Sequence, residues 1–327
     1  MVRFRGQWFK LVGIGVISAI LTFPLNVLGT TLSPDVASTA TTATTATPQV
    51  NAFQAVVLGM VQGLTEFLPI SSTAHLKVVP VALGWGDPGV AYTAVIQLGS
   101  IAAVLWYFWK DLVQITTGAI KAIRTSDYQS TEFRMAVGIA LGTIPIVFFG
   151  LLIKIFIPDF DNSPIRSLSA IAVASIVMSL LLGLAEKIGK RKREFEDLTV
   201  QDGVCMGLAQ AMALIPGVSR SGSTLTAGLF IGLERAAAAR FSFLLGIPAI
   251  TLAGLVELKG ALEEGIGDAG LISLVIGSLS ALVFSYLSIA WLLRFLQTQS
   301  TWVFIWYRLV FGVVILGAIA IGALRNI

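Results

Sequence analysis

Long apolar runs, separated by short polar segments, dominate the chain after residue 50. About 20 apolar residues, rising 1.5 Å each as a helix, cross the hydrocarbon core of a bilayer. Six runs reach this length, at roughly 91–109, 135–157, 168–188, 241–258, 271–293 and 303–324. This pattern is typical of an all-α polytopic membrane protein with six transmembrane helices.

Two further apolar regions, 52–84 and 203–233, are interrupted in the middle by a proline and a hydroxyl cluster. Connections rich in Lys and Arg are expected inside, and connections poor in them outside. This rule places 110–134 and 186–202 inside and 158–167 and 259–270 outside. Both ends of each interrupted region then lie on the same side. We therefore predict two re-entrant helical hairpins, whose irregular tips must be surrounded by protein or water.

The two hairpin regions resemble each other. Gly59-x-x-Gln62 precedes one proline-serine tip, and Gly207-x-x-Gln210 precedes the other. One hairpin enters from outside and the other from inside, and three spans follow each. The sequence therefore predicts an inverted-topology repeat. The membrane domain is expected over 51–327, with the first repeat at about 51–200 and the second at about 201–327.

The N-terminal region has a different character. Arg3, Arg5 and Lys10 precede the apolar run 11–29, which is typical of a signal peptide or a signal anchor. The stretch VASTATTATTA, residues 37–47, is a low-complexity sequence. Residues 1–50 are therefore expected to be an extra N-terminal signal or anchor segment with a disordered Thr/Ala-rich linker.

Composition agrees with a membrane protein. The chain is 56% hydrophobic and 12% charged, whereas about a quarter of the residues in a soluble domain are charged. The basic residues behind the net charge of +4 gather at the membrane edges, so we expect no nucleic-acid partner. Cys205 is the only cysteine and His75 the only histidine. An intrachain disulfide and a site with several imidazoles are thereby excluded.

The first hairpin carries unusual chemistry for an apolar region. Gln62 and Glu66 lie four residues apart and share a helical face. An intramembrane carboxylate is costly and is a functional candidate by default. Hydroxyls and the imidazole follow within ten residues, at Ser71, Ser72, Thr73 and His75. As alternatives, Ser72 and Thr73 are ordinary helix caps and His75 is a satisfied core residue.

The second hairpin contains PGVSRSGST, residues 216–224. Arg220 supplies a rigid, permanently charged fork suited to phosphate. Hydroxyls surround it at Ser219, Ser221, Ser223 and Thr224. The alternative is that Arg220 snorkels to an interface or pairs with Glu66 for structure. The stretch lacks GxxxxGK[ST], so nothing indicates nucleotide hydrolysis.

Together, the two hairpins suit hydrolysis of a phosphate ester or a diphosphate. Glu66 would repel a polyanion unless a cation intervened, and Mg²⁺ or Ca²⁺ held by Gln62, Glu66 and substrate phosphates removes that conflict. The competing class is an anion or lipid-phosphate transporter, because secondary transporters share inverted repeats and broken helices. A structural scaffold would leave Glu66 and Arg220 unexplained.

QGLTEFLPISSTAH and PGVSRSGST resemble the two signature motifs of the bacterial undecaprenyl-diphosphate phosphatases, also called bacitracin-resistance proteins. The likeness runs from about residue 52 to 327, and Gln62 takes a variant form of its position. The resemblance implies an enzyme that converts undecaprenyl diphosphate to the monophosphate carrier lipid of cell-wall synthesis. It also implies a multi-pass protein of the bacterial plasma membrane with an active site open to the outer face.

With this resemblance, we expect the following roles. Catalytic residues are Glu66, Ser72, His75 and Arg220; substrate-binding residues are Ser71, Thr73, Ser219, Ser221 and Thr224; metal ligands are Gln62 and Glu66. His75 acts either as general base or as nucleophile, and Ser72 is the alternative nucleophile or a phosphate donor. The expected partners are a polyprenyl diphosphate lipid and the bilayer, and a homodimer is compatible with the sequence.

Overall fold

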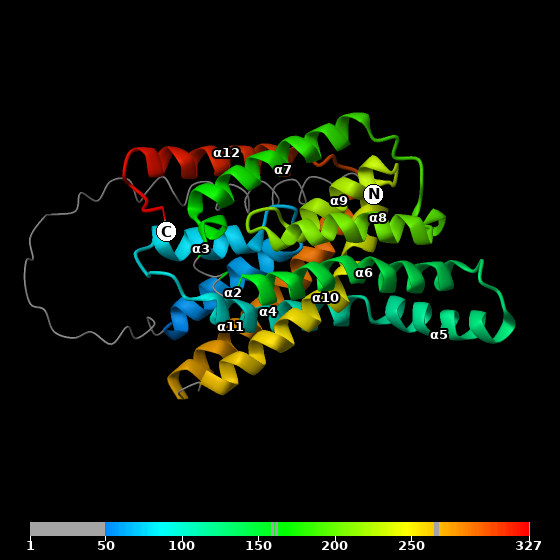
Figure 1. The fold of residues 1–327 in the computed structure, drawn as a ribbon, viewed down its shortest axis with the longest axis horizontal. Helices are drawn as coiled ribbons and strands as arrows, with labels where there is room; N and C mark the ends of the chain where they lie inside the picture. The colour runs from blue at the N-terminus through cyan, green and yellow to red at the C-terminus, as the bar shows by residue number, and fades with distance from the viewer. Residues whose placement is uncertain (1–49, 158–159, 161–162, 265–267, 327) are drawn as a thin grey trace, which may run out of the picture.

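The computed structural model describes residues 50–157, 160, 163–264 and 268–326 (Figure 1). Within these ranges the regular elements are helices, and no strand is present. The fold is therefore all-α, as the apolar pattern predicted. Short 3₁₀ turns lie at Pro164–Arg166, Phe195–Asp197 and Met212–Leu214. The predicted N-terminal anchor and its linker, residues 1–49, lie outside the described residues.

Five helices of the described residues are long and apolar enough to cross a membrane. They are α6 (Thr131–Phe156), α7 (Leu168–Ile188), α10 (Arg235–Glu264), α11 (Asp268–Leu296) and α12 (Trp302–Ala320). Each coincides with one of the apolar runs. A sixth span results if α4 (Val90–Tyr107) and α5 (Trp109–Thr125), which are bent by 65° where they meet, are taken together.

Helix α5 occupies much of the connection 110–134, which the sequence pattern predicted to be a loop. It is amphipathic: Ile115 and Ala122 are buried, whereas Lys110 and Lys121 are exposed. It lies beside α6 (Figure 1). A search for continuous apolar runs misses such a helix, because its polar face lowers the mean hydropathy of the segment.

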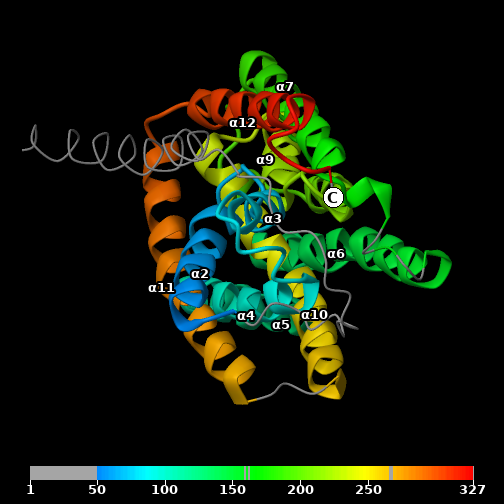
Figure 2. The same cartoon turned by 90° about the vertical axis from the view of Figure 1, so that its left-hand side faces the viewer.

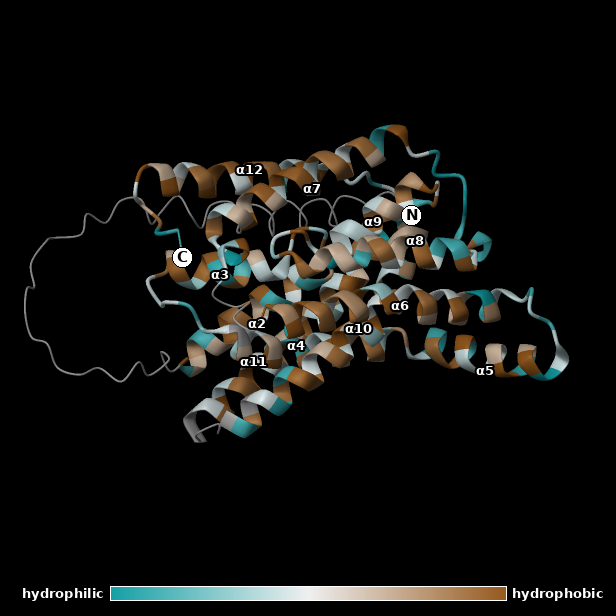
Figure 3. Cartoon of the chain, viewed as in Figure 1, coloured by the Kyte–Doolittle hydropathy of each residue, from teal (hydrophilic) through white to brown (hydrophobic). Residues whose placement is uncertain are grey.

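Apolar residues run along the long helices (Figure 3), and many of their side chains are exposed in the described part of the chain. On α6 these side chains include Ile144, Phe148, Leu151 and Ile155, which recur every three or four residues along one side. A continuous apolar surface of this kind is unfavourable in water and normal against lipid tails. The chain is therefore a multi-pass membrane protein.

Two pairs of short helices differ from these spans. They are α2 (Ala52–Glu66) with α3 (Ser72–Ala82), and α8 (Val200–Ala211) with α9 (Arg220–Phe230). At 1.5 Å per residue, the 11 residues of α3 or of α9 cover only about half of a bilayer core. In Figure 2 α3 and α9 lie in the middle of the molecule, with α6, α7, α10, α11 and α12 around them.

The first helix of each pair packs against a long helix through glycine. A Cβ atom added to Gly59 of α2 would lie 2.2 Å from the carbonyl oxygen of Gly277 in α11. A Cβ atom added to Gly207 of α8 would lie 2.1 Å from the carbonyl oxygen of Gly142 in α6. Without these side chains the helix backbones touch, which favours packing within a membrane. Gly59 and Gly207 are the equivalent positions of the two sequence motifs.

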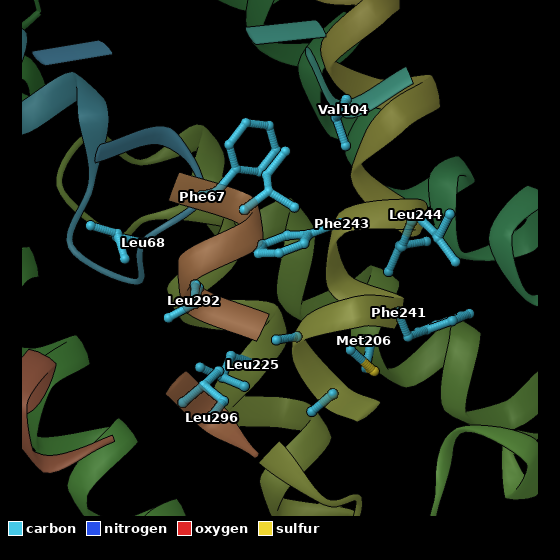
Figure 4. Close-up of a cluster of buried hydrophobic side chains, with 14 of the residues drawn as sticks. Phe67, Leu68, Val104, Met206, Leu225, Phe241, Phe243, Leu244, Leu292 and Leu296 are labelled. Carbon is cyan, nitrogen blue, oxygen red and sulfur yellow. The ribbon is translucent and has the colours of Figure 1, made fainter. Parts of the chain in front are cut away.

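A buried aromatic cluster anchors the end of α2 to the rest of the molecule (Figure 4). Phe67, directly after α2, packs edge to face against Phe243 of α10, with 5.2 Å between ring centroids. Phe108, between α4 and α5, contacts the same ring at 6.2 Å. Because rotation of a packed aromatic side chain would open a void, this cluster fixes the direction in which the chain leaves α2.

The α6–α8 contact predicts the effect of a single methyl group. Gly207→Ala should destabilise the protein by about 1–3 kcal/mol, because the Cβ atom meets the backbone of Gly142 and the helices must separate. Thermal unfolding in detergent measures this loss. Gly317→Ala in α12 is the matched control, since no atom lies within 4 Å of its added Cβ atom. Equal unfolding temperatures for the two variants would contradict this packing account.

Candidate active site

The carboxylate of Glu66 lies where α2 ends, next to the first residue of α3. Its Oε2 atom accepts hydrogen bonds from Ser72 Oγ at 2.6 Å and from Gln62 Nε2 at 3.1 Å. Its Oε1 atom lies 3.5 Å from Gln97 Nε2 of α4. Glu66 is buried, and Ser72 is half-buried. The 2.6 Å contact holds the Ser72 hydroxyl against a group that can take its proton.

Arg220 joins this carboxylate from the second helix pair. It is the first residue of α9, and its Nη2 atom lies 3.2 Å from Glu66 Oε1. The side chains are only 9% and 6% exposed. Its Nε and Nη1 atoms have no hydrogen-bond partner among the described residues. Buried guanidinium donors left unpaired are costly, so they mark a place where an anionic ligand would be stabilised.

The two tips, residues 67–71 and 215–219, are built alike. Ser71 and Ser219 have positive φ angles of 75° and 73°, and their side chains accept from the backbone N–H groups of Ala74 and Gly222. Each serine thereby caps the short helix that follows it. Positive φ is uncommon for a non-glycine residue and marks local strain, which is concentrated at functional sites.

Two hydroxyls that were predicted to bind substrate, those of Ser221 and Thr224, form hydrogen bonds within the protein instead. Ser221 Oγ donates to the carbonyl oxygen of Leu68 at 2.9 Å, so it ties the second helix pair to the first tip. Thr224 Oγ1 donates to the carbonyl oxygen of Arg220 at 2.7 Å and is fully buried. Neither residue lines the cavity described below, whereas Ser71, Ser72, Thr73 and Ser219 do.

His75 is also directed away from the cavity. Its Nδ1–H donates to the carbonyl oxygen of Ser71 at 2.7 Å, and Nε2 lies 2.6 Å from the hydroxyl of Tyr307 in α12. A carbonyl oxygen only accepts, so the neutral ring receives the Tyr307 hydrogen at Nε2. The ring is stacked on Phe311, with 4.4 Å between centroids, and lies nearly parallel to the ring of Tyr307. With both nitrogens engaged, the imidazole orients Ser71 and the first tip.

Sequence reasoning did not single out Arg308, although it lies at the centre of this region. Its fully buried guanidinium comes from α12 and donates to Pro69 O at 3.1 Å, to Gly217 O at 2.8 Å and to Val218 O at 3.0 Å. It therefore binds the carbonyl oxygens of both tips. An arginine inside the apolar run 303–324 was the available signal, because such a charge rarely faces lipid.

The cavity beside these groups has two chambers that share Ser72, Thr73 and Gln97 in their walls. The Arg220 chamber, of about 190 Å³, is also lined by Glu66, Ser71, Gly217, Ser219 and Arg220, and by apolar residues of α6, α10 and the second tip. The Lys77 chamber, of about 160 Å³, is also lined by Gln62, Lys77, Asp87, Thr93 and Arg166. Ser72 therefore lies at the boundary between the two.

The donor set fits a hard divalent cation. Glu66 supplies a carboxylate, and the carboxamides of Gln62 and Gln97 lie within hydrogen-bond distance of it. Among the described residues no group of three or more His, Cys, Asp or Glu side chains could hold a metal ion. A cation here would therefore complete its shell with water and substrate oxygens, which is the usual mode of Mg²⁺.

The fold and the cavity define a class of protein: a multi-pass membrane protein with a cavity, lined by Glu66, Arg220 and several hydroxyls, at the tips of two pairs of short helices. Comparison with protein families matches residues 55–314 to the family described as Bacitracin resistance protein BacA. The chain belongs to this family.

Three similar curated proteins each carry the name undecaprenyl-diphosphatase. The protein from Nostoc sp. (strain PCC 7120) is 67% identical over 327 residues, which is all of both chains. The protein from Trichodesmium erythraeum is 68% identical over 85% of this chain and 89% of its own length. The protein from Synechocystis sp. (strain PCC 6803) is 69% identical over 84% of each chain.

The Arg308 contacts predict that this residue is needed for stability. Arg308→Met should lower the free energy of unfolding by at least about 2 kcal/mol, because buried carbonyl oxygens at both tips lose their donor. Thermal unfolding in detergent measures the loss, with Arg294→Met on the exposed face of α11 as control. An Arg308→Met protein as stable as that control would show that the tips are held together by other contacts.

Proposed function

We propose that this protein hydrolyses undecaprenyl diphosphate to undecaprenyl phosphate and inorganic phosphate. The reaction regenerates the carrier lipid of peptidoglycan synthesis, and it accounts for bacitracin resistance. The observation that carries this proposal is the group of Ser72, Glu66 and Arg220: a hydroxyl 2.6 Å from a carboxylate, beside a buried guanidinium with unpaired donors. The names of the curated relatives supply the identity of the lipid.

The Arg220 chamber suits a lipid with a diphosphate head group. Ile146, Ile215, Ala249, Ile250 and Ala253 form its apolar wall. Residues of the tips and the end of α2 form its polar wall. A polyprenyl chain can therefore lie along the apolar wall and remain in the hydrocarbon region, while its diphosphate reaches the guanidinium.

The geometry favours Ser72 as the nucleophile. Its oxygen attacks the terminal phosphorus, Glu66 Oε2 accepts the hydroxyl proton, and the bond to the bridging oxygen breaks to release undecaprenyl phosphate. Arg220 neutralises charge on the transferring group through its unpaired N–H donors. Glu66 passes the hydroxyl proton to the departing undecaprenyl phosphate and is again a carboxylate. It then takes a proton from the water molecule that attacks phosphorus, and this proton returns to the Ser72 oxygen as inorganic phosphate leaves. His75 remains a positioning residue.

The remaining expected residues have supporting roles in this scheme. Ser219 and Thr73 lie in the chamber wall and can donate to phosphate oxygens. Ser221 and Thr224 hold the second tip in position rather than the substrate. A Mg²⁺ or Ca²⁺ ion would be held by Glu66 and by the Gln62 side chain. When bound, it neutralises the diphosphate and removes its repulsion from Glu66.

We further infer that the two short helix pairs are re-entrant hairpins of an inverted repeat. The short lengths of α3 and α9, the equivalent glycine contacts of α2 and α8, and the paired serine caps support this topology. Asp87 and Arg166 belong to connections expected on the outer side, and both line the Lys77 chamber. This supports an active site open to the outer face of the plasma membrane.

Phosphate release by purified protein in detergent tests the function. Magnesium or calcium should stimulate release from undecaprenyl diphosphate, and a chelator should abolish it. Arg220→Lys should lower kcat/KM by about 10²–10³-fold, because a single ammonium group cannot replace the planar fork. Arg124→Lys, an exposed substitution on α5, is the matched control. Transport in vesicles without phosphate release in detergent would favour the transporter alternative.

Trapping the intermediate tests the nucleophile. Acid quench of turnover with substrate labelled at the terminal phosphate should give an acid-stable, base-labile phosphoserine at Ser72. Ser72→Ala should give no label and lower kcat at least about 100-fold. His75→Gln should still give phosphoserine, formed more slowly because the first tip is less well oriented. A parallel quench in alkali would preserve a label on His75, which is labile to acid and stable to base, and a label found there would overturn the assignment.

A further inference from the structure

The Lys77 chamber carries charge that the proposed chemistry does not use. Lys77 and Arg166 contribute two cations, and Asp87 contributes one carboxylate. Lys77 Nζ donates to the carbonyl oxygen of Arg166 at 2.9 Å, which leaves two of its three N–H groups for other partners. The wall of this chamber therefore carries two cationic side chains, one carboxylate and free ammonium donors of Lys77, and it also includes Ser72.

Sequence position explains why these groups face the same space. Thr73 and Lys77 lie four residues apart on α3, so they share a helical face. Arg166 ends the 3₁₀ turn before α7, and its carbonyl oxygen fixes the Lys77 side chain. Asp87 has one carboxylate oxygen occupied by the backbone N–H of Gly89 at 2.9 Å. That bond is part of the local turn and reduces the repulsion that Asp87 offers to an anion.

The two chambers differ in what they can hold. The apolar lining of the Arg220 chamber includes residues of α6, α10 and the second tip, whereas the Lys77 chamber adds the charged side chains of Lys77, Asp87 and Arg166. An inorganic phosphate ion released at Ser72 cannot leave along the apolar wall without a large desolvation cost. The Lys77 chamber begins at the same serine. Its volume of about 160 Å³ is large enough for a small anion with several waters.

We propose that the Lys77 chamber is a binding subsite for inorganic phosphate on its way out of the protein. Lys77 and Arg166 are its anion-binding groups, and Asp87 limits its affinity so that the product is released. This proposal rests on the hydrolysis proposed above, because it assigns the chamber to the product of that reaction. It predicts that inorganic phosphate inhibits turnover through this chamber.

Inhibition by added inorganic phosphate tests the subsite. Lys77→Met and Arg166→Gln should each raise the inhibition constant for phosphate about tenfold or more, because a charge-assisted hydrogen bond is lost. The KM for undecaprenyl diphosphate should change less than twofold. Asp87→Asn should act in the opposite direction and lower the inhibition constant, since the amide keeps the bond from Gly89 and removes the repulsive charge.

Lys259→Met is the matched control. Lys259 is exposed on α10, pairs with Glu263, and lies in a segment expected on the same side of the membrane. Lys259→Met lowers the net charge by the same amount as Lys77→Met, and it should leave the inhibition constant for phosphate unchanged. If the inhibition constant for phosphate rose equally in the Lys259→Met control, general surface charge rather than this chamber would attract phosphate. Equal increases in KM and in the phosphate constant for Lys77→Met would assign the chamber to the substrate and overturn the exit role.

Direct binding separates this inference from the proposed reaction. Inorganic phosphate should bind to the Ser72→Ala protein in detergent, as measured by calorimetry or phosphorus NMR, and Lys77→Met in that background should weaken the binding about tenfold. If wild-type protein releases no phosphate from the lipid, the reaction is wrong although this binding can persist. If turnover is normal but neither Lys77 nor Arg166 affects phosphate binding, the subsite is wrong and the reaction stands.

Discussion

The buried guanidinium of Arg308 is the contact on which the proposed active site depends. Placing a charge without a carboxylate partner inside a membrane protein costs several kcal/mol. Hydrogen bonds to Pro69, Gly217 and Val218 offset that cost, and their carbonyl oxygens belong to two tips about 150 residues apart in sequence. Backbone carbonyls in irregular tips would otherwise remain unpaired at this depth. One side chain thus satisfies both tips and sets the distance between them.

The position of Arg308 also affects the electrostatics of the cavity. Arg220 is paired with Glu66, so this pair alone offers no net charge to a diphosphate. Arg308 forms no ion pair among the described residues and contributes a positive charge behind both tips. In a region of low dielectric constant such a charge attracts an anion over a longer distance than it would in water. Arg308, which holds the two tips together, can therefore also favour phosphate binding.

The sequence alone predicted the helical class, the long spans and the group of Gln62, Glu66 and Ser72, because these depend on local patterns. Arg220, 154 residues from Glu66, was assigned to the same site because the two hairpins resemble each other. The partners of His75 could not be predicted in this way. Tyr307 is 232 residues away in sequence and lies in a run that pattern analysis describes only as apolar. The same run contained Arg308, whose charge was the missed signal. Helix α5 was missed because its polar face lowers the mean hydropathy of the segment, so the pattern predicted a loop there.

The two tips show how one backbone arrangement can serve different chemistry. Ser71 and Ser219 cap their helices with nearly the same positive φ, so the next residue occupies the first helical position in each case. In the first pair that residue is Ser72, and in the second it is Arg220. The proposed nucleophile and the proposed phosphate-binding cation thus occupy equivalent positions of the two helix pairs. Because both positions are fixed by capping and by Arg308, their separation is preorganised and does not depend on the substrate for assembly.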